Sequence, residues 1–454
     1  MHHFMKLFIK KCIFGQKLHT FCSPTMKTLL TAVILLCSTL ASAQLNFTAI
    51  DTTASATCKL GLEEEYKAKF KVFNKGVAAA TSAQKSILKD IYSGAQESFL
   101  ERIQNNDFIC DNELNPYLQG LMAEILTQNG INVKEYRMLL SREADVNAYN
   151  TGDGTIVVHY GLLNSVDTED ELVFVICHEV GHQYLEHRKK WVESIAQVST
   201  SEEVIKKTRE IKKQKYGRGT QATQFLKGIM YQKYSMRRQE EIEADSIGLV
   251  FYKKTLRNQT APVTMLEKLD KSDKEKDTLT VADYRFIFEK NGVKLKDRYF
   301  EEDETLFNQY DKTPQRIDVD SLKTHPDCTT RIALLKGYLN NQFNGSPKTS
   351  SAFEKLKVNC AYQNLLNLYN AEEYGFALYE ALKLYKHEPE NPFLKNIIYI
   401  TLVKLKDSRV SYTINRYVPS HDKLTNSASE NRFISFINNI KLSDLDIIVN
   451  TFKS

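Results

Sequence analysis

The sequence predicts a mostly helical α+β fold, in which a small sheet lies beside one capped apolar helix and an all-helical C-terminal region follows. Three observations indicate this. Apolar residues over 114–126 recur at helical spacing, two short β-prone stretches flank Gly152-Asp153-Gly154, and helical periodicity returns after about residue 337. A chain of 454 residues is long enough for two or three domains.

Residues 1–43 are predicted to be an export signal. They hold five lysines and no arginine, aspartate or glutamate. From Met26, the expected functional start, a basic residue precedes a short apolar run and the cleavage motif Ala41-Ser42-Ala43. Because the run is too short to cross a bilayer comfortably, we expect a soluble periplasmic or secreted protein with no membrane segment after cleavage.

The rest of the chain is electrically balanced. The net charge of +5 comes from the five signal lysines, which leave 56 basic and 56 acidic residues elsewhere. This balance offers no overall electrostatic argument for a nucleic-acid partner. With 42% hydrophobic and 26% charged residues, the composition also argues against intrinsic disorder.

Five cysteines remain after cleavage. An odd number in an oxidising compartment leaves at least one free thiol, and Cys177 is the candidate because it lies in an apolar helical run. Proximity in the sequence suggests the pairs Cys58–Cys110 and Cys328–Cys360.

The main domain is expected over residues 44–336. Residues 95–130 are predicted to be mostly helical, with a break near Pro116 and a stop at Gly130. The stretches 135–142 and 155–160 are predicted to form a small sheet or hairpin. Thr168 and Glu171 form a capping box that opens a helix extending to about Ile195.

Charge dominates the later part of this domain. Residues 201–235 are predicted to form charged helices with a break at Gly217-Arg218-Gly219. The charged side of these helices is either exposed to solvent or binds a membrane surface or a partner. Another helix is expected over 236–252. Residues 268–323 are rich in charge and sparse in apolar clusters, which predicts an inserted segment outside the core.

The C-terminal region, residues 337–454, is predicted to be all-helical. Tyr374, Ala377, Ala381 and Pro389 are spaced like the second half of a tetratricopeptide unit, whose stacked helix pairs form concave peptide-binding surfaces. A plain helical hairpin explains the spacing equally well.

The motif His178-Glu179-Val180-Gly181-His182 carries the chemistry. Two histidines at i and i+4 lie on one face of a helix, so that both can bind one zinc ion. Glu179 is then placed to take the proton of a water bound to zinc. The sequence therefore predicts one zinc ion per chain.

The third ligand is expected from a later helix. Metzincin zinc enzymes take a third histidine six residues after the second one, but this chain has Arg188 at that position, so the metzincin arrangement is excluded. His187 is one residue out of register and is expected at the surface. Glu241 is the candidate, because Asp245 follows at i+4 and could hold a ligating histidine from behind. Ala244 lets the two helices approach.

Together these motifs resemble the HtpX/BepA/Oma-type zinc metallopeptidases, relatives of the CAAX prenyl protease. The resemblance covers residues 147–332 and includes Asn147-Ala148-Tyr149, HExxH, Glu241-Ile242-Glu243-Ala244-Asp245, Thr324-His325-Pro326 and Arg331-Ile332. It implies a gluzincin fold with zinc on His178, His182 and Glu241, Glu179 as the base, and Asp245 and Arg331 supporting the ligands. The absence of transmembrane helices around HExxH makes the chain more similar to the soluble periplasmic BepA-like branch, which combines a protease with tetratricopeptide helices and acts in envelope protein quality control.

His325 has two interpretations. Pro326 and Asp327 suit a helix start. The family pattern instead places His325 near the metal, where it would hold the enzyme latent or stabilise the transition state.

We therefore expect an exported zinc endopeptidase that hydrolyses misfolded or unassembled envelope proteins, with envelope or outer-membrane assembly factors as further candidate partners. Substrate is expected to add as an extended strand to an edge strand formed by Thr155, Ile156, Val157, Val158 and His159. The alternative is a catalytically idle, chaperone-like adaptor that binds clients through its C-terminal helices.

Overall fold

The structure is a computed structural model, and it describes residues 47, 49–50, 56–214, 217–271, 277–301, 328–340, 345–422 and 426–453, without the side chains of 218–220 and 222–236. The helices and strands in these ranges belong to one compact unit, Thr48–Ser454. Within the described ranges, no helix is both long and apolar enough to cross a membrane. The predicted export signal lies outside the described residues.

A three-stranded sheet forms the centre of the N-terminal part. Its strands are β1 (Arg137–Ser141), β2 (Ala148–Asn150) and β3 (Thr155–His159), in the order β1-β3-β2. β3 pairs parallel with β1 and antiparallel with β2. The prediction that residues 155–159 form an edge strand is therefore wrong, since β3 is the central strand. All five of its residues are buried, as expected for a strand covered on both faces.

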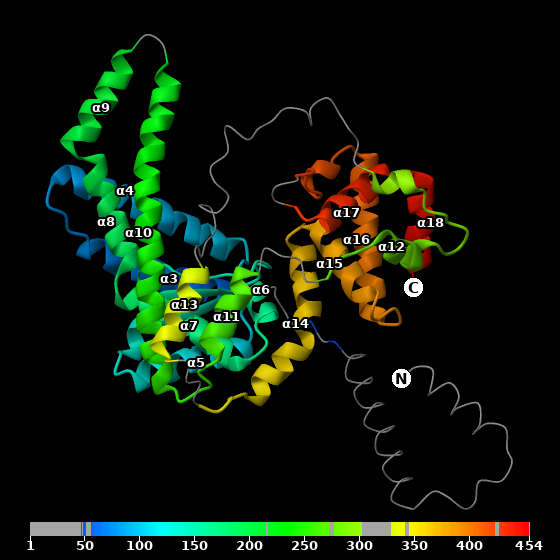
Figure 1. Cartoon of the computed structure of the whole chain (residues 1–454), viewed down its shortest axis with the longest axis horizontal. Coiled ribbons are helices and arrows are strands. Elements are labelled where there is room, and N and C mark those ends of the chain that lie inside the picture. Colours follow the sequence, from blue (N-terminus) through cyan, green and yellow to red (C-terminus); the bar gives the residue numbers. More distant parts are fainter. Residues whose placement is uncertain are drawn as a thin grey trace, which may run out of the picture. The chain divides into compact units, whose positions relative to one another are not determined.

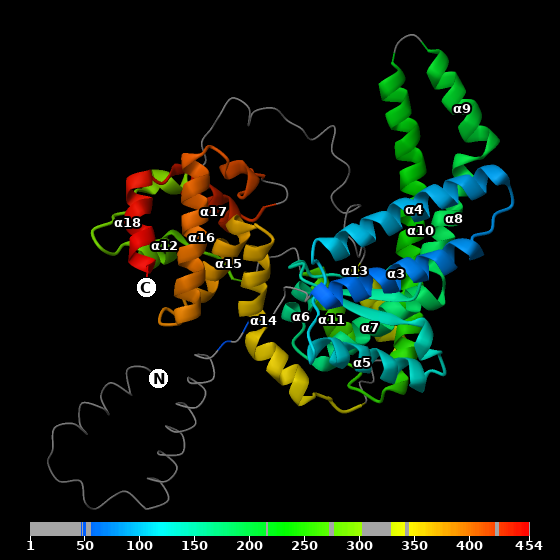
Figure 2. The ribbon, with the colours of Figure 1, turned by 180° about the vertical axis from the view of Figure 1, so that it is seen from behind.

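The two faces of the sheet pack against different helices. Ile156 and Val158 belong to the large core that includes residues of α5 (Leu114–Gln128) and α7 (Glu169–Tyr184). Val157 points to the opposite face, because side chains alternate along a strand, and packs with α3 (Ala56–Gly76) and α4 (Ser82–Gln104). Figure 2 shows α3 and α4 running side by side next to the strands. Helices therefore cover both faces of the sheet.

The stretch 95–130 is mostly helical with one break, as predicted. α4 ends at Gln104 and α5 begins at Leu114, so the break lies before Pro116 and not at it. Pro116 falls in the first turn of α5, where a missing N–H breaks no helical bond. Gly130 follows α5 with a φ of +68° and ends it as predicted.

Helix α7 begins as predicted and ends early. Thr168 and Glu171 form the expected capping box. The helix stops at Tyr184, well short of Ile195, because Glu186 adopts a left-handed φ of +54° that no right-handed helix accommodates. α8 (His187–Ser199) then leaves in a new direction.

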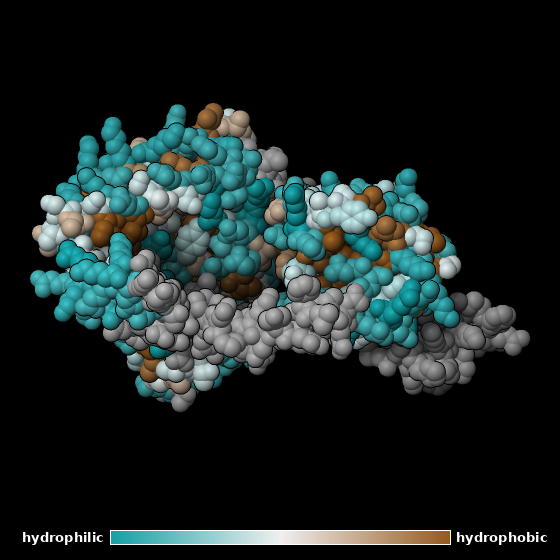
Figure 3. All heavy atoms as spheres, turned by 90° about the horizontal axis from the view of Figure 1, so that it is seen from above, coloured by the Kyte–Doolittle hydropathy of each residue, from teal (hydrophilic) through white to brown (hydrophobic). Residues whose placement is uncertain are grey.

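The predicted charged helices are α9 (Glu202–Lys213) and α10 (Arg218–Lys254), which run side by side in Figure 1 with Gly217 at the break. The helix expected over 236–252 is the second half of α10. Most of α9 is exposed and only Ile211 is buried, which fits a solvated helix. Figure 3 likewise shows a face on which hydrophilic residues predominate and apolar residues form separate patches. The remaining elements of this part are η1 (Val133–Glu135), α6 (Tyr160–Ser165), α11 (Ala261–Asp270) and α13 (Cys328–Tyr338).

Helices α7 and α10 approach closely because small residues line their contact. A Cβ at Gly181 of α7 would lie 3.0 Å from the Ala244 carbonyl oxygen, and a Cβ at Gly248 of α10 would lie 3.1 Å from the backbone of His178. Ala244 is fully buried between them, as expected. This spacing brings the acidic segment of α10 against the HExxH segment of α7.

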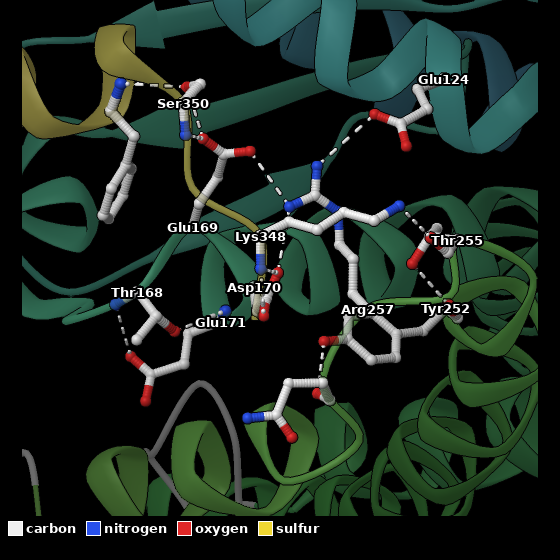
Figure 4. Close-up of polar contacts among 12 residues, drawn as sticks. Glu124, Thr168, Glu169, Asp170, Glu171, Tyr252, Thr255, Arg257, Lys348 and Ser350 are labelled. Carbon is white, nitrogen blue, oxygen red and sulfur yellow. Dashed lines mark hydrogen bonds and ion pairs between the residues drawn. The ribbon is translucent and has the colours of Figure 1, made fainter. Parts of the chain in front are cut away.

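A buried ion cluster anchors the first turn of α7 (Figure 4). Arg257 Nη1 lies 3.0 Å from both the Glu169 and Asp170 carboxylates. The same carboxylates accept hydrogen bonds from the backbone N–H groups of Ser350 and Lys348. The start of α7 is thus tied both to the residues after α10 and to the segment that leads into the C-terminal helices.

The C-terminal part is helical, as predicted. It contains α14 (Ser351–Asn370), α15 (Tyr374–Tyr385), α16 (Pro392–Val410), η6 (Ile414–Arg416), α17 (Ala428–Asn439) and α18 (Leu442–Phe452). α15 packs against both α14 and α16. Whether these helices form a tetratricopeptide repeat stays a prediction.

Residues 268–323, predicted to be an inserted segment outside the core of the main domain, are partly helical in their described middle part and belong to an aromatic cluster of the C-terminal part. α12 (Val281–Phe288) and η2 (Asp297–Phe300) pack on the C-terminal helices, where Phe436 meets the rings of Tyr284, Phe288 and Phe300 at 4.9–5.5 Å. The high average charge of the segment hides an apolar face at helical spacing, formed by Tyr284, Ile287 and Phe288.

One of the two expected disulfides is present. Cys58, at the start of α3, is bonded to Cys110, and Cys177 is free and buried, both as predicted. The pairing of Cys328 with Cys360 is wrong, because no disulfide joins them and they are buried on different helices. Nearness in the sequence did not bring these two side chains together.

Candidate metal centre

Three donor groups converge where α7 meets α10. His178 and His182 lie one turn apart on α7, with their Nε2 atoms 3.0 Å apart. Glu241 of α10 lies opposite, with one carboxylate oxygen 3.5 Å from His178 Nε2 and the other 3.4 Å from His182 Nε2. The structure thus brings together the three predicted ligands, whose donor atoms all lie within 4.8 Å of one another.

This donor set fits a zinc ion. Two imidazole nitrogens and one carboxylate oxygen are a known ligand set of catalytic zinc, and such a site keeps a fourth position open for chemistry. His178 and Glu241 are buried, which holds their donor atoms in place, and His182 is partly exposed. The neighbouring Glu243 faces His187 and does not belong to the group.

Asp245 and Arg331 lie directly behind the three donors. His178 Nδ1 is 2.9 Å from Asp245 Oδ1, so that Nε2 is the nitrogen that faces the other donors. Arg331, from α13, donates through Nε and Nη2 to the two oxygens of Asp245, at 2.6 and 2.8 Å. Its Nη1 lies 2.9 Å from Glu241. One buried guanidinium therefore fixes both carboxylates relative to each other.

The charges of this network keep Asp245 ionised. Burial raises the pKa of Asp245, but its bonds to Arg331 and His178 outweigh burial and hold that pKa below its usual value. Burial lowers the pKa of His178, whereas Asp245 and Glu241 raise it to about 10. An ionised Asp245 can hold the Nδ1–H of His178, which leaves Nε2 as the metal-facing nitrogen.

His187 was expected at the surface, and this prediction is wrong. The side chain is only 4% exposed. The left-handed turn at Glu186 directs it back under α7, where its Nδ1 lies 2.9 Å from His182 Nδ1 and its Nε2 lies 3.3 Å from Glu243. Burial and the nearby His182 lower the pKa of His187 to about 4. Sequence reasoning missed this contact because it assumed an unbroken helix.

Glu179 lies beside a small cavity next to the three donors. The side chain is buried, at 3% exposure. Residues on two sides of the cavity come from the segment that enters β2 and from α11. They are Val146, Asn147 and Ala148 on one side, and Met265, Leu266 and Leu269 on the other. Glu179, the predicted base, thus lies beside the start of β2.

His159 is not part of this donor group. His159 lies on β3 between two carboxylates, with Nδ1 2.6 Å from Asp145 and Nε2 2.5 Å from Glu143. These contacts raise its pKa against the effect of burial. His325 lies outside the described residues, together with Thr324 and Pro326.

Gluzincin metallopeptidases are defined by a helix that bears HExxH and is faced by a glutamate from a later helix. The sequence motifs of this chain resemble that class. The comparison with known families agrees: the model of peptidase family M48 matches residues 112–339, and the chain belongs to this family. No curated protein matches the chain. The matched region runs from the end of the segment before α5 to the residues after α13, so the α3–α4 hairpin and α14–α18 lie outside it.

Proposed function

We propose that this protein is an exported zinc-dependent endopeptidase. The observation that carries the proposal is the convergence of His178, His182 and Glu241 beside a cavity that holds Glu179. Zinc held by these three residues would polarise the scissile carbonyl and acidify the attacking water. Membership of family M48 supports a peptidase with polypeptide substrates.

Glu179 would move the proton during the reaction. Its carboxylate accepts a proton from the attacking water and then donates it to the amine that leaves. The residues behind the donors do not touch substrate in this scheme. They hold the donors still, since Arg331 fixes Glu241 and Asp245 while Asp245 orients His178.

Among the described residues, no strand pairs with the other edge of β2, and this open edge replaces β3 as the expected substrate strand. His159 N–H donates to the Asn147 carbonyl, and Thr151 N–H donates to the Thr155 carbonyl. In an antiparallel pair such residues alternate with residues whose backbone groups point away from the partner strand. Ala148 and Asn150 therefore turn N–H and C=O toward the open edge, where an extended peptide can pair with them.

Export and a role in quality control belong to the same proposal. The Cys58–Cys110 disulfide supports export, because such bonds persist in oxidising compartments. Strand pairing recognises extended backbone more than sequence, which suits misfolded or unassembled polypeptides. The likeness to the BepA-like branch and to tetratricopeptide helices stays part of this proposal.

The deciding experiment is Glu179→Gln. Glutamine keeps the shape of the side chain and cannot act as a base, so casein hydrolysis should fall by roughly 10²–10⁴-fold. Metal analysis of the same sample should still find one zinc per chain, whereas His178→Ala should lose zinc. A zinc-loaded Glu179→Gln that still cleaves casein would refute the assigned base, and a wild-type protein that holds zinc without hydrolysing any polypeptide would favour the adaptor.

A further inference from the structure

A second cavity lies on the other face of the sheet, away from the metal centre. Its volume is about 270 Å³, near the lower end of the roughly 300–1,000 Å³ typical of ligand pockets. Its walls are α3, α4, the residues 149–153 of β2 and its turn, and the start of α8. Five aromatic rings line it: Phe70, Phe73, Tyr92, Phe99 and Tyr149.

The fold holds these walls in place. α4 packs against α8, and the turn after β2 meets α8 at Gly152, where an added Cβ would lie 2.8 Å from Arg188 Cγ. The Cys58–Cys110 disulfide ties the start of α3 to the segment before α5. The cavity is therefore built between the matched family domain and a helical hairpin outside that match.

Two charged groups of the lining, Arg102 and Asp153, are already engaged, and five aromatic rings leave much of the lining apolar, which favours a largely apolar occupant. Arg102 lies 2.8 Å from Glu143, pairs with Asp107 and donates to the Tyr149 hydroxyl. Asp153 lies 3.4 Å from Lys69. Arg188 and Asn150 also line the cavity. The apolar surface beside them consists of ring faces and edges, such as the edge-to-face pair Phe73 and Tyr92 at 4.9 Å.

The register of β2 identifies the occupant. A peptide paired with the open edge of β2 has a residue opposite Tyr149, and opposite residues in paired strands share a face. Tyr149 lines this cavity, whereas Ala148 lines the cavity of Glu179 on the other face. Successive side chains of the peptide would therefore alternate between the two cavities.

We infer that this cavity is a specificity pocket, which takes a large apolar or aromatic side chain of the polypeptide lying along β2. The inference rests on the proposed function and adds a preference for one peptide position. The peptide residue opposite Tyr149 carries the large side chain, and the residues next to it face the metal side. Because α3 and α4 form most of the lining, the preference belongs to this chain's own N-terminal hairpin.

The test fills the pocket without removing any of its contacts. Ala95 is exposed on α4 and lines the cavity, so Ala95→Trp should block it. Ala83→Trp is the matched control, because Ala83 is exposed on the same helix and does not line the cavity. Ser98→Trp is a second blocking variant in case the first does not fold, as judged by circular dichroism and melting temperature.

Cleavage sites in a peptide library, read by mass spectrometry, should show large apolar residues enriched at one position beside the bond cut by the wild type. The kcat/KM ratio between a phenylalanine peptide and its alanine twin should fall at least about tenfold in Ala95→Trp and stay unchanged in Ala83→Trp. An unchanged ratio and an unchanged site profile in both folded blocking variants would overturn the inference.

A binding measurement separates this inference from the proposed function. Fluorescence anisotropy with the same two labelled peptides is carried out on the zinc-loaded Glu179→Gln background. Weaker binding of the phenylalanine peptide in Ala95→Trp alone supports the pocket even if no variant hydrolyses peptides. Equal binding of both peptides by the Glu179→Gln protein with no further change, with Ala95→Trp and with Ala83→Trp would refute the pocket, whatever the outcome for proteolysis.

Discussion

Arg331 is the residue that joins the separate parts of the candidate centre. It is 2% exposed and reaches Asp245 and Glu241 from α13, more than eighty residues along the chain. Removing one partner of such a buried ion pair leaves the others uncompensated, at a cost of about 3–5 kcal/mol. The sequence pointed to Arg331 only through the family resemblance, because nothing local relates an arginine of α13 to a glutamate of α10.

The register of the third ligand can be tested at single residues. Neighbouring positions on a helix point about 100° apart, so only Glu241 of the acidic segment faces both histidines. Glu241→Ala should lose bound zinc, measured by metal analysis after gel filtration. Glu240→Ala is the matched control, since Glu240 is outside the donor group, and it should keep zinc. The reverse result would mean that the register is wrong.

His187 should position His182. Its ring lies 2.9 Å from the far nitrogen of His182, and Glu243 holds it from the other side. Loss of such a supporting contact typically weakens metal affinity 10–100-fold, so we expect about that change in His187→Ala. Competition with a chelating dye measures zinc affinity directly. Lys189→Ala, an exposed change on the same helix, serves as the control, and equal affinities in the two variants would show that His187 only fills space.

At the scale of elements, the distance between α7 and α10 decides whether the donors meet. Glu241 belongs to one helix and both histidines to the other, so the glycines at their contact position the site without touching it. This dependence is visible only in the packed structure. From the sequence, Gly181 is merely a variable position within HExxH.

Gly248→Val should push the two helices apart. The new side chain would meet the backbone of His178 and Cys177, where overpacking typically costs about 1–3 kcal/mol. Urea unfolding measures this loss, and zinc affinity should fall with it. Gly120→Val is the control, because a Cβ at Gly120 of α5 meets nothing within 4 Å. If Gly248→Val matches Gly120→Val in unfolding free energy and in zinc affinity, the close approach of α7 and α10 is not needed for the metal site.

At the scale of the whole molecule, the disulfide holds the N-terminal hairpin to the family domain. It closes a loop across 52 residues of sequence and lies at the start of α3. Removing a native disulfide typically costs about 2–5 kcal/mol. The hairpin carries most of the aromatic lining of the second cavity, so its attachment bears on substrate preference as well as on stability.

The thiol count of the chain from residue 44 onward tests this arrangement. With one disulfide among five cysteines, three thiols should react with Ellman's reagent in denaturant without reductant. One reactive thiol would indicate that Cys328 and Cys360 do pair. The double variant Cys58→Ser and Cys110→Ser should lower the free energy of unfolding by about 2–5 kcal/mol. The control is Cys328→Ser with Cys360→Ser, which also replaces two cysteines, both buried, by serine. In limited proteolysis this control should keep the α3–α4 hairpin attached.

Features that depend on spacing within one helix could be predicted from the residues alone. The capping box before α7, the shared face of His178 and His182, and the register of Glu241 with Asp245 follow from a repeat of 3.6 residues, which holds wherever the helix lies. The same local reasoning paired Cys58 with Cys110 correctly and Cys328 with Cys360 wrongly, because nearness in the sequence says little about nearness in space.

Which elements meet became clear only from the packing of the folded chain. It made β3 the central strand, turned His187 under α7, and packed α12 against α17. Periodicity shows that a face is apolar, and it does not show which other face will cover it. The physical reason is that burial of apolar surface is not directional, so the partner of each face is selected by the packing of the whole chain.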